Sequence, residues 1–259
     1  MGDEALKELN AEVRAYWELE PCGTFAEVVG DAPEHSREWF ERVENHRYAL
    51  EPFIHSVAQF TRHRGKQLLE VGVGAGTDHL QWARAGCECH GVDLTDAAIE
   101  TTRAHLAVHG LSSDLRRIDA RTLPFEDASM DLVYSWGVIH HSEDPQVIID
   151  EIRRVLKPGG QFIGMLYGSR SLVVLKLWIR HGLLAGRPFR SRAELVWNHM
   201  ESVGTKAYTT AEVARLFEAF SAARIEPIVT SHDRNLVPRR IAALLPASWG
   251  WFITIQARK

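Results

Sequence analysis

Glycines and an acidic residue of one part of the chain suit the binding of a nucleotide-like ligand. Within the segment 70–78, which reads EVGVGAGTD, glycines stand at Gly72, Gly74 and Gly76. Glycine lets a backbone turn tightly from a strand into a helix and approach a ligand without a Cβ in the way. Asp93 follows Gly72 by 21 residues, close to the separation of about 20 residues at which a carboxylate meets ribose hydroxyls. The pattern predicts a nucleotide-containing cofactor at this loop.

Two further acidic residues bear on which cofactor this is. Glu70 lies two residues before the first glycine, and Asp78 directly follows the loop. The third glycine comes one residue earlier than in the G-x-G-x-x-G loop of dinucleotide-binding proteins. Negative charge here repels a pyrophosphate and favours a cationic ligand, and S-adenosylmethionine carries a sulfonium and an ammonium group. The alternatives are a loop without a ligand and, for Asp78, an acid favoured by the helix dipole.

A pair of adjacent histidines could supply a base. His140 and His141 follow an apolar run at 130–135. The unperturbed pKa of histidine, about 6.5, lies near working pH, so a histidine can take a proton from a phenol, thiol or amine. We expect one of the two, His141 in preference, to act as the base or to orient the acceptor. The alternative is that one of them packs against or caps the next helix.

Alternating strand and helix signals surround these residues. Short apolar runs predict strands at 67–71, 87–93, 115–119, 130–135, 161–167, 224–231 and 249–257. Helices are predicted at 78–85, from an N-cap at Thr95 to about His109, after Asp144-Pro145, and after the capping box Thr209-x-x-Glu212. Lys157-Pro-Gly-Gly160 is expected to end the helix that follows Asp144-Pro145, before the fifth strand begins.

This order predicts an α/β protein with a Rossmann-like, doubly wound seven-stranded sheet and helical cap elements. We expect a helical cap at 1–60, a cofactor-binding core at 61–168, an insertion forming a substrate lid at 169–205, and the rest of the core sheet at 206–259. Ligands of such sheets bind at the carboxyl ends of the strands, and both cap segments could fold over that edge.

The composition is that of an ordinary folded protein. Of 259 residues, 45% are hydrophobic and 25% are charged, which excludes disordered and collagen-like classes. A net charge of −4 is too balanced for nucleic acid held mainly by charge. Three cysteines are an odd, sparse set, typical of reduced thiols. Because no signal peptide or transmembrane segment is evident, we expect a cytoplasmic protein.

Four stretches carry a family resemblance. They are LEVGVGAGTD, GVDLT, LPFEDASMDLVYSWGVIHH and LKPGGQF, in this order between residues 66 and 168. The series resembles the successive motifs of class I S-adenosylmethionine-dependent methyltransferases. Within that class it is most similar to the group that includes the ubiquinone and menaquinone biosynthesis enzymes and many small-molecule methyltransferases. The resemblance implies S-adenosyl-L-methionine as the cofactor.

The resemblance also implies roles for the residues of the glycine loop. Gly72, Gly74 and Gly76 are expected to pass beneath the methionine half of the cofactor, with Glu70 ordering the loop. Asp78 departs from the commonest pattern, in which a small or apolar residue stands here. We expect it to pair with the cofactor ammonium.

Residues after the later strands complete the implied site. The resemblance implies that Asp93 takes the ribose hydroxyls and that Leu94 packs on the adenine. Asp119 and Ala120 are expected beside the adenine amino group. The pair Ser135-Trp136 is expected beside the methionine portion and the acceptor.

The expected activity is transfer of a methyl group by direct displacement to an oxygen, sulfur or nitrogen atom of a small molecule. Alignment of donor and acceptor can supply about 7–11 kcal/mol of such catalysis. The alternatives are a lipid-like quinone precursor or a macromolecule as acceptor, a non-catalytic cofactor-binding regulator, and an NAD-dependent dehydrogenase. DNA is not expected as substrate, because the N/D-P-P-Y/F tetrad of amino-directed nucleic-acid methyltransferases is absent after the fourth strand.

Two other features have several interpretations. The segment 171–200 is rich in Leu, Trp and Arg, and we expect a lid over a small acceptor, with a homodimer contact or a membrane-resting surface as alternatives. Cys87-x-Cys89-His90 lacks a second pair of ligands, so we expect a buried structural role and no metal site.

Overall fold

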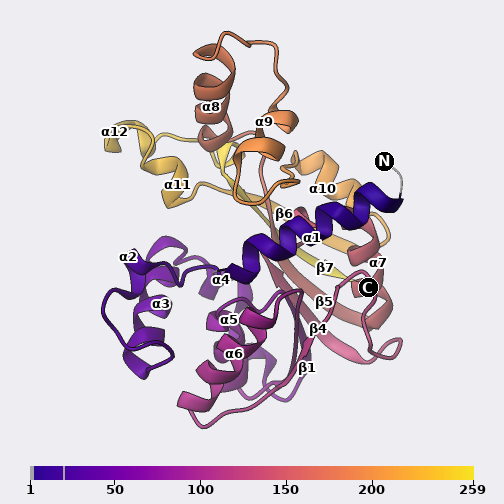
Figure 1. Ribbon diagram of the computed structural model, residues 1–259. Helices are drawn as coiled ribbons and strands as arrows, with labels where there is room; N and C mark the ends of the chain where they lie inside the picture. Colours follow the sequence, from indigo (N-terminus) through magenta and orange to yellow (C-terminus); the bar gives the residue numbers. More distant parts are fainter. Residues whose placement is uncertain (1–2, 20) are drawn as a thin grey trace. The chain divides into compact units, whose positions relative to one another are not determined.

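The computed structural model describes residues 3–19 and 21–259 (Figure 1). The helices are α1 (Asp3–Leu19), α2 (Ala26–Val29), α3 (Arg37–Leu50), α4 (Ile54–Ala58), α5 (Thr77–Arg84), α6 (Asp96–Val108), α7 (Pro145–Val155), α8 (Leu172–Trp178), α9 (Arg192–His199), α10 (Thr210–Leu216), α11 (Ser231–Arg234) and α12 (Arg239–Ala242). Short helical turns are η1 (Phe60–His63), η2 (Ile139–His141), the π-helical η3 (Ile179–Leu183) and η4 (Ala247–Trp249). None of the described helices is both long and apolar enough to cross a bilayer.

The strands form one seven-stranded sheet in the order β3-β2-β1-β4-β5-β7-β6. They are β1 (Gln67–Val71), β2 (Glu88–Asp93), β3 (Asp114–Arg117), β4 (Met130–Trp136), β5 (Leu156–Tyr167), β6 (Ala222–Ile228) and β7 (Phe252–Arg258). β1 is parallel to β2 and β4, β2 is parallel to β3, and β6 is antiparallel to β7. The predicted Rossmann-like seven-stranded sheet is confirmed, with a mixed rather than an all-parallel arrangement.

Four strands, β3, β5, β6 and β7, differ from their predicted bounds by two residues or more at one end or both, and the differences at β3 and β5 concern predicted features. β3 ends at Arg117, so Asp119 lies beyond the strand rather than at its end. β5 begins at Leu156 and includes the predicted Lys-Pro-Gly-Gly break. The reason lies at the end of the chain: the amide of Gly159 donates to the carbonyl of Lys259 at 2.9 Å, and the amide of Lys259 donates to the carbonyl of Gly160 at 3.0 Å. A pairing with a residue about 100 positions away leaves no local signal.

The chain divides into two compact units. One consists of Arg14–Ser135, Asp150–Ile163 and Lys259, and it holds the glycine loop. The other consists of Met1–Val13, Trp136–Ile149 and Gly164–Arg258, and it holds the adjacent histidines. The four-segment division expected from the sequence stays a prediction.

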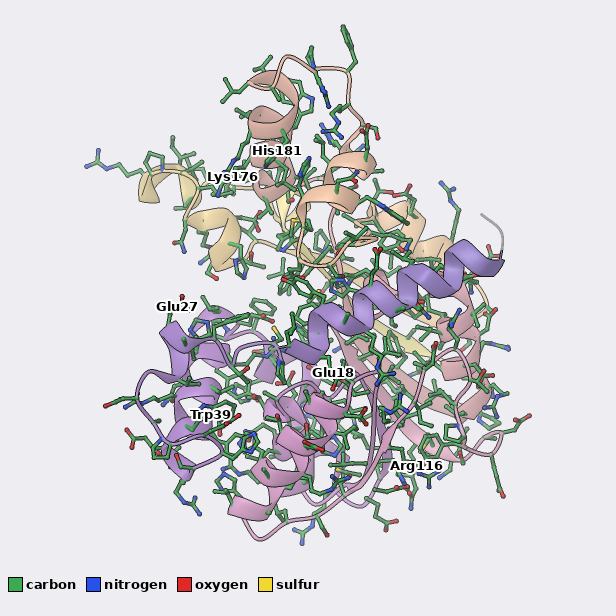
Figure 2. The ribbon with its side chains drawn as sticks, viewed as in Figure 1. Glu18, Glu27, Trp39, Arg116, Lys176 and His181 are labelled. Carbon is green, nitrogen blue, oxygen red and sulfur yellow. The ribbon has the colours of Figure 1, made fainter. Side chains whose placement is uncertain are left out.

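Helix α3 contributes three side chains to one buried cluster of the first unit. Ser36 caps the helix, since its hydroxyl accepts from the amide of Trp39 at 3.2 Å. Trp39, Phe40 and Val43 share one face of the helix and are buried together with Ala75 of the glycine loop. Trp39 is labelled on α3 in Figure 2. The packing therefore joins the N-terminal helices to the loop that is expected to bind the cofactor.

Local signals are confirmed at two predicted helix starts. Thr95 accepts from the amide of Ala98 at 3.3 Å at the start of α6. Glu18, labelled in Figure 2, also accepts from the amide of Ala97 at 2.9 Å. At α10, Thr209 and Glu212 form the predicted capping box. Each contact satisfies a backbone amide that the helix leaves unpaired.

We predict that Phe40→Ala lowers the free energy of unfolding by about 3–5 kcal/mol, because the substitution leaves a cavity in a packed core. Phe40 is 0% exposed, and its ring stacks on His105 with centroids 4.0 Å apart. Urea denaturation measures the change. Phe189→Ala is the matched control, because that ring is 98% exposed and its loss should change stability by under about 0.5 kcal/mol. Equal effects of the two substitutions would contradict the described core.

Candidate cofactor site and histidine turn

The glycine loop connects β1 to α5 in left-handed backbone conformations. The φ angles are +83° at Gly72, +53° at Gly74 and +75° at Gly76, a region that strongly favours glycine. A Cβ on Gly76 would lie 2.9 Å from the side chain of Thr102 on α6, whereas a Cβ on Gly74 would meet nothing within 4 Å. Gly76 is thus required by close helix packing, and Gly74 borders open space that a ligand can enter.

Side chains of α6 fix the carbonyls of this loop. The hydroxyl of Thr102 donates to the carbonyl of Gly74 at 3.0 Å. Nδ1 of His105 lies 3.0 Å from the carbonyl of Ala75 and must be the donor, because a carbonyl only accepts. Burial lowers the pKa of His105 to about 4. A neutral histidine therefore carries its proton on the nitrogen that faces the loop.

Asp93 reaches the loop from the end of β2. One carboxylate oxygen accepts from the amide of Gly74 at 3.2 Å. The other accepts from the amide and the hydroxyl of Thr95 at 3.0 and 2.8 Å. Burial raises the pKa of Asp93. The amide of Ile118 donates to the carbonyl of Asp93 at 2.7 Å, so the segment just before Asp119 lies beside Asp93.

A chain of buried hydrogen bonds accounts for Glu70. Its Oε2 lies 2.9 Å from Nδ1 of His79, whose Nε2 lies 2.9 Å from the hydroxyl of Ser113. That hydroxyl donates to the carbonyl of Cys89 at 2.6 Å, so His79 must donate through Nε2. Burial raises the pKa of Glu70 well above its usual value and lowers that of His79 to about 3. We infer that a protonated Glu70 donates to the neutral His79, so Glu70 brings no negative charge to the loop.

Asp78 is the centre of a buried network that the sequence analysis missed. Its Oδ2 accepts from Arg47 at 2.8 Å and from the hydroxyl of Tyr134 at 2.9 Å, and its Oδ1 accepts from the hydroxyl of Tyr48 at 3.0 Å. Arg47 also pairs with Glu51 at 3.0 Å. We expected the cofactor ammonium as the cation beside Asp78. The structure supplies Arg47, from a helix 31 residues earlier, where no sequence signal marked it.

The remaining expected cofactor residues are distributed over three strand ends. Ser135 is 1% exposed, and its hydroxyl has no hydrogen-bond partner among the described residues. It directly follows Tyr134, which is in register with Glu70 of β1. The carboxylate of Asp119 is held by Arg121 at 2.7 Å. Leu94, Ala120 and Trp136 follow or end their strands, and their expected cofactor contacts stay predictions.

In the second unit, the histidine turn η2 holds His141 through its Nδ1 nitrogen. Nδ1 lies 3.0 Å from the hydroxyl of Ser202 and 3.1 Å from that of Thr205, and Nε2 lies 3.5 Å from Glu201. The hydroxyl of Tyr167 donates to the same carboxylate at 3.0 Å. Burial lowers the pKa of His141 to about 3. His141 is thus a neutral residue whose Nδ1 is engaged by two hydroxyl groups and whose Nε2 faces the carboxylate of Glu201.

The ring nitrogens of His140 differ from those of His141 in their hydrogen bonding. It is 0% exposed, and neither ring nitrogen has a hydrogen-bond partner among the residues that the structure describes. Its ring packs on Tyr167 with centroids 3.8 Å apart. Burial lowers its pKa well below the ordinary value, so it is neutral. An unpaired buried donor or acceptor costs about 1–3 kcal/mol, and these nitrogens are therefore suited to a polar group from outside the chain.

The side chains of the cysteine segment are half-buried and contact neighbouring groups of the chain. Sγ of Cys87 lies 3.2 Å from the carbonyl of His63, and burial raises the thiol pKa of Cys87 to about 11. His90 lies 3.2 Å from Asp114 and 3.2 Å from Gln67. Within residues 3–19 and 21–259, no group of three or more potential ligands could hold a metal ion.

Comparison with known families decides the nature of the first site. Residues 69–164 match the family described as "Methyltransferase domain". This segment is a methyltransferase domain. This match supports a class I methyltransferase domain with S-adenosylmethionine as its cofactor. Open space at Gly74, the carboxylate of Asp93 and the unpaired buried hydroxyl of Ser135 fit a ligand with ribose and amino-acid groups.

Curated relatives are similar to this chain over 98 residues. The chain is 32% identical over 98 residues to the ubiquinone biosynthesis O-methyltransferase of Stutzerimonas stutzeri strain A1501, which covers 38% of this chain and 42% of that protein. The enzyme of the same name from Idiomarina loihiensis is 34% identical over 98 residues and covers 38% and 40%. The chain thus spans about two fifths of the length of these relatives.

Solved structures extend the similarity in fold to most of the chain. A protein from Pyrococcus horikoshii OT3 superposes with a TM-score of 0.59 at 20% identity, covering 94% of this chain and 98% of that one. An S-adenosylmethionine dependent methyltransferase from Mesorhizobium loti gives 0.56 at 19% identity and covers 76% and 92%. At these identities the comparison establishes the fold alone.

We predict that Glu70→Gln binds S-adenosylhomocysteine within about threefold of the wild type, because a neutral amide can still donate to Nδ1 of His79. Glu70→Ala leaves that buried nitrogen unpaired, which costs about 1–3 kcal/mol. It should weaken binding about tenfold or more by isothermal titration calorimetry. If Glu70→Gln binds as weakly as Glu70→Ala, a charged carboxylate is required at this position.

The buried His141 makes stability depend on pH. Its pKa is about 3 in the folded protein and about 6.5 when unfolded, so below pH 6.5 the unfolded chain binds a proton that the folded chain does not. Its contribution is therefore present above pH 6.5 and is lost as the pH falls toward 3. We predict that His141→Asn reduces the slope of unfolding free energy against pH near 5.5 by about 1.4 kcal/mol per pH unit. Urea titrations at pH 5.0 to 7.5 test this, and an unchanged slope would contradict it.

Proposed function

We propose that the protein transfers the methyl group of S-adenosylmethionine to a hydroxyl group of a small molecule. The family of residues 69–164 supports the methyl transfer. The observation that carries the choice of acceptor is His140, a neutral, fully buried imidazole whose two nitrogens have no partner among the described residues. A neutral imidazole offers one donor and one acceptor, which is the complement of a hydroxyl group.

The sequence favoured His141 as the base, and the geometry favours its neighbour. Nδ1 of His141 is engaged by Ser202 and Thr205, and its Nε2 faces the carboxylate of Glu201 at 3.5 Å. Neither ring nitrogen of His140 has a contact of this kind among the described residues. We therefore assign to His141 the positioning of the turn. His140 is the residue we propose to accept the proton.

The proposed reaction is a direct displacement. When bound, S-adenosylmethionine supplies a methyl group activated by the sulfonium. The acceptor oxygen forms a bond to the methyl carbon as the carbon–sulfur bond breaks, and the hydroxyl proton passes to a ring nitrogen of His140. The protein aligns the reactants, and burial keeps His140 neutral before the proton is transferred.

On the cofactor side, we propose that Asp93 accepts from the ribose hydroxyls. The buried ion pair of Arg47 and Asp78 complements the amino-acid end of the cofactor, which carries one carboxylate and one ammonium. In this proposal Asp78 is shared between Arg47 and the ammonium. The residues Leu94, Asp119, Ala120, Ser135 and Trp136 keep the roles expected from the resemblance.

The curated relatives favour oxygen as the methylated atom, since both carry the name O-methyltransferase. Their connection with ubiquinone biosynthesis favours a lipid-like quinone precursor as a second candidate acceptor. We further propose a cytoplasmic protein, in keeping with three cysteines that form no disulfide. The lid formed by residues 169–205 and the homodimer stay predictions.

We predict that His140→Phe lowers methyl transfer to a hydroxyl acceptor by about 100-fold or more, the usual contribution of a general base. Phenylalanine retains the ring that packs on Tyr167. Transfer of a labelled methyl group to panels of phenols, thiols and amines measures the activity, and calorimetric titration with S-adenosylhomocysteine shows that the variant still binds cofactor. Asp93→Ala should instead abolish that binding.

Three results would contradict the proposal. Undiminished turnover by His140→Phe would remove His140 from the reaction. A thiol or amine as the preferred acceptor would exclude hydroxyl methylation. Cofactor binding without transfer to any acceptor would favour the non-catalytic regulator.

A further inference from the structure

The connection between α8 and α9 exposes large apolar side chains. We call residues 179–192 the insertion tip. Leu183 is 50% exposed, Leu184 is 77% exposed and Phe189 is 98% exposed. Apolar side chains exposed singly are ordinary on protein surfaces, whereas a group of them within a few residues marks an interaction site.

The insertion tip is folded rather than extended. The indole nitrogen of Trp178 donates to the carbonyl of Pro188 at 3.1 Å. The amide of Arg187 donates to the carbonyl of Gly182 at 2.8 Å. These bonds close residues 178–188 into a compact turn, drawn in Figure 1 between α8 and α9. The apolar side chains therefore project from a structured loop.

Basic residues are concentrated in the same segment of the chain. Between residues 172 and 193 there are five basic residues and no acidic one, in a chain whose net charge is −4. Arg190 pairs with Glu194 at 2.8 Å. The other four basic residues are exposed and have no ion-pair partner among the described residues; they are Lys176, Arg180, Arg187 and Arg192. Figure 2 labels Lys176 on α8 and His181 on the turn that follows.

We propose that the insertion tip docks on an anionic lipid bilayer. Leucine and phenylalanine side chains can enter the boundary between headgroups and acyl chains, while arginine side chains remain at the phosphates. Each basic residue near an anionic surface strengthens such binding. A second copy of the chain is a poorer occupant, because two such tips would bring unpaired positive charges together. The proposal concerns a surface distinct from the methyl-transfer residues and holds or fails independently of the acceptor.

Cosedimentation of the full chain with vesicles tests this. We expect binding to vesicles of phosphatidylglycerol and phosphatidylcholine, little binding to phosphatidylcholine alone, and weaker binding in 0.5 M than in about 0.1 M NaCl. The triple substitution Arg180→Gln, Arg187→Gln and Arg192→Gln should weaken partitioning about 100-fold, at about fivefold per charge. Leu184→Gln with Phe189→Gln should weaken it at least about tenfold.

Matched substitutions elsewhere provide the controls. Leu19→Gln, at a leucine that is 87% exposed, and Arg103→Gln, at an exposed arginine, should leave vesicle binding unchanged. Unchanged binding of S-adenosylhomocysteine shows that each variant is folded. Failure of the wild type to bind phosphatidylglycerol vesicles would overturn the proposal. Sedimentation velocity distinguishes the alternative occupant. If the wild type does not bind vesicles and Leu184→Gln/Phe189→Gln sediments with a lower mass than the wild type, the proposal is overturned and the insertion tip is assigned to self-association.

Discussion

The close approach of α6 to the glycine loop is the constraint on which the methyltransferase site depends. Gly76 is required there because a Cβ would lie 2.9 Å from the side chain of Thr102. That approach lets Thr102 and His105 donate to the carbonyls of Gly74 and Ala75. Asp93 accepts from the amide of Gly74. Contacts from α6 and from Asp93 therefore hold the glycines of the loop in left-handed backbone conformations, and open space remains at Gly74.

Desolvation decides the charge state of the polar groups beneath this loop. Two buried carboxyl groups, those of Glu70 and Asp78, have different hydrogen-bond and charge partners. Glu70 faces a neutral His79, and burial raises its pKa. Asp78 faces Arg47 and two tyrosines, so its charge is compensated by a full ion pair. A charge removed from water persists only where a partner of opposite charge or several donors replace the water. The same principle keeps His140 neutral, with nitrogens that can bind an uncharged acceptor group.

Several features could be predicted from the sequence alone, because each depends on neighbours within a few residues. Glycines at 72, 74 and 76 are needed wherever a strand turns this tightly into a helix. Caps at Thr95 and Thr209 satisfy amides in the very next turn. Alternating apolar runs and helices indicate a doubly wound sheet, since parallel strands need crossover connections. The sequence thus determined the seven-stranded fold and the position of the glycine loop.

The tertiary structure alone decided which side chains are engaged and which are available. Arg47 is 31 residues from Asp78, and Glu201 is 60 residues from His141, so no local pattern marks either pair. The extension of β5 through Gly159 depends on pairing with Lys259 at the end of the chain. The choice between His140 and His141 likewise depends on whether distant residues reach the ring nitrogens. Hydrogen bonding and burial are set by groups that meet only in the folded chain, because sequence spacing carries no information on contacts between remote segments.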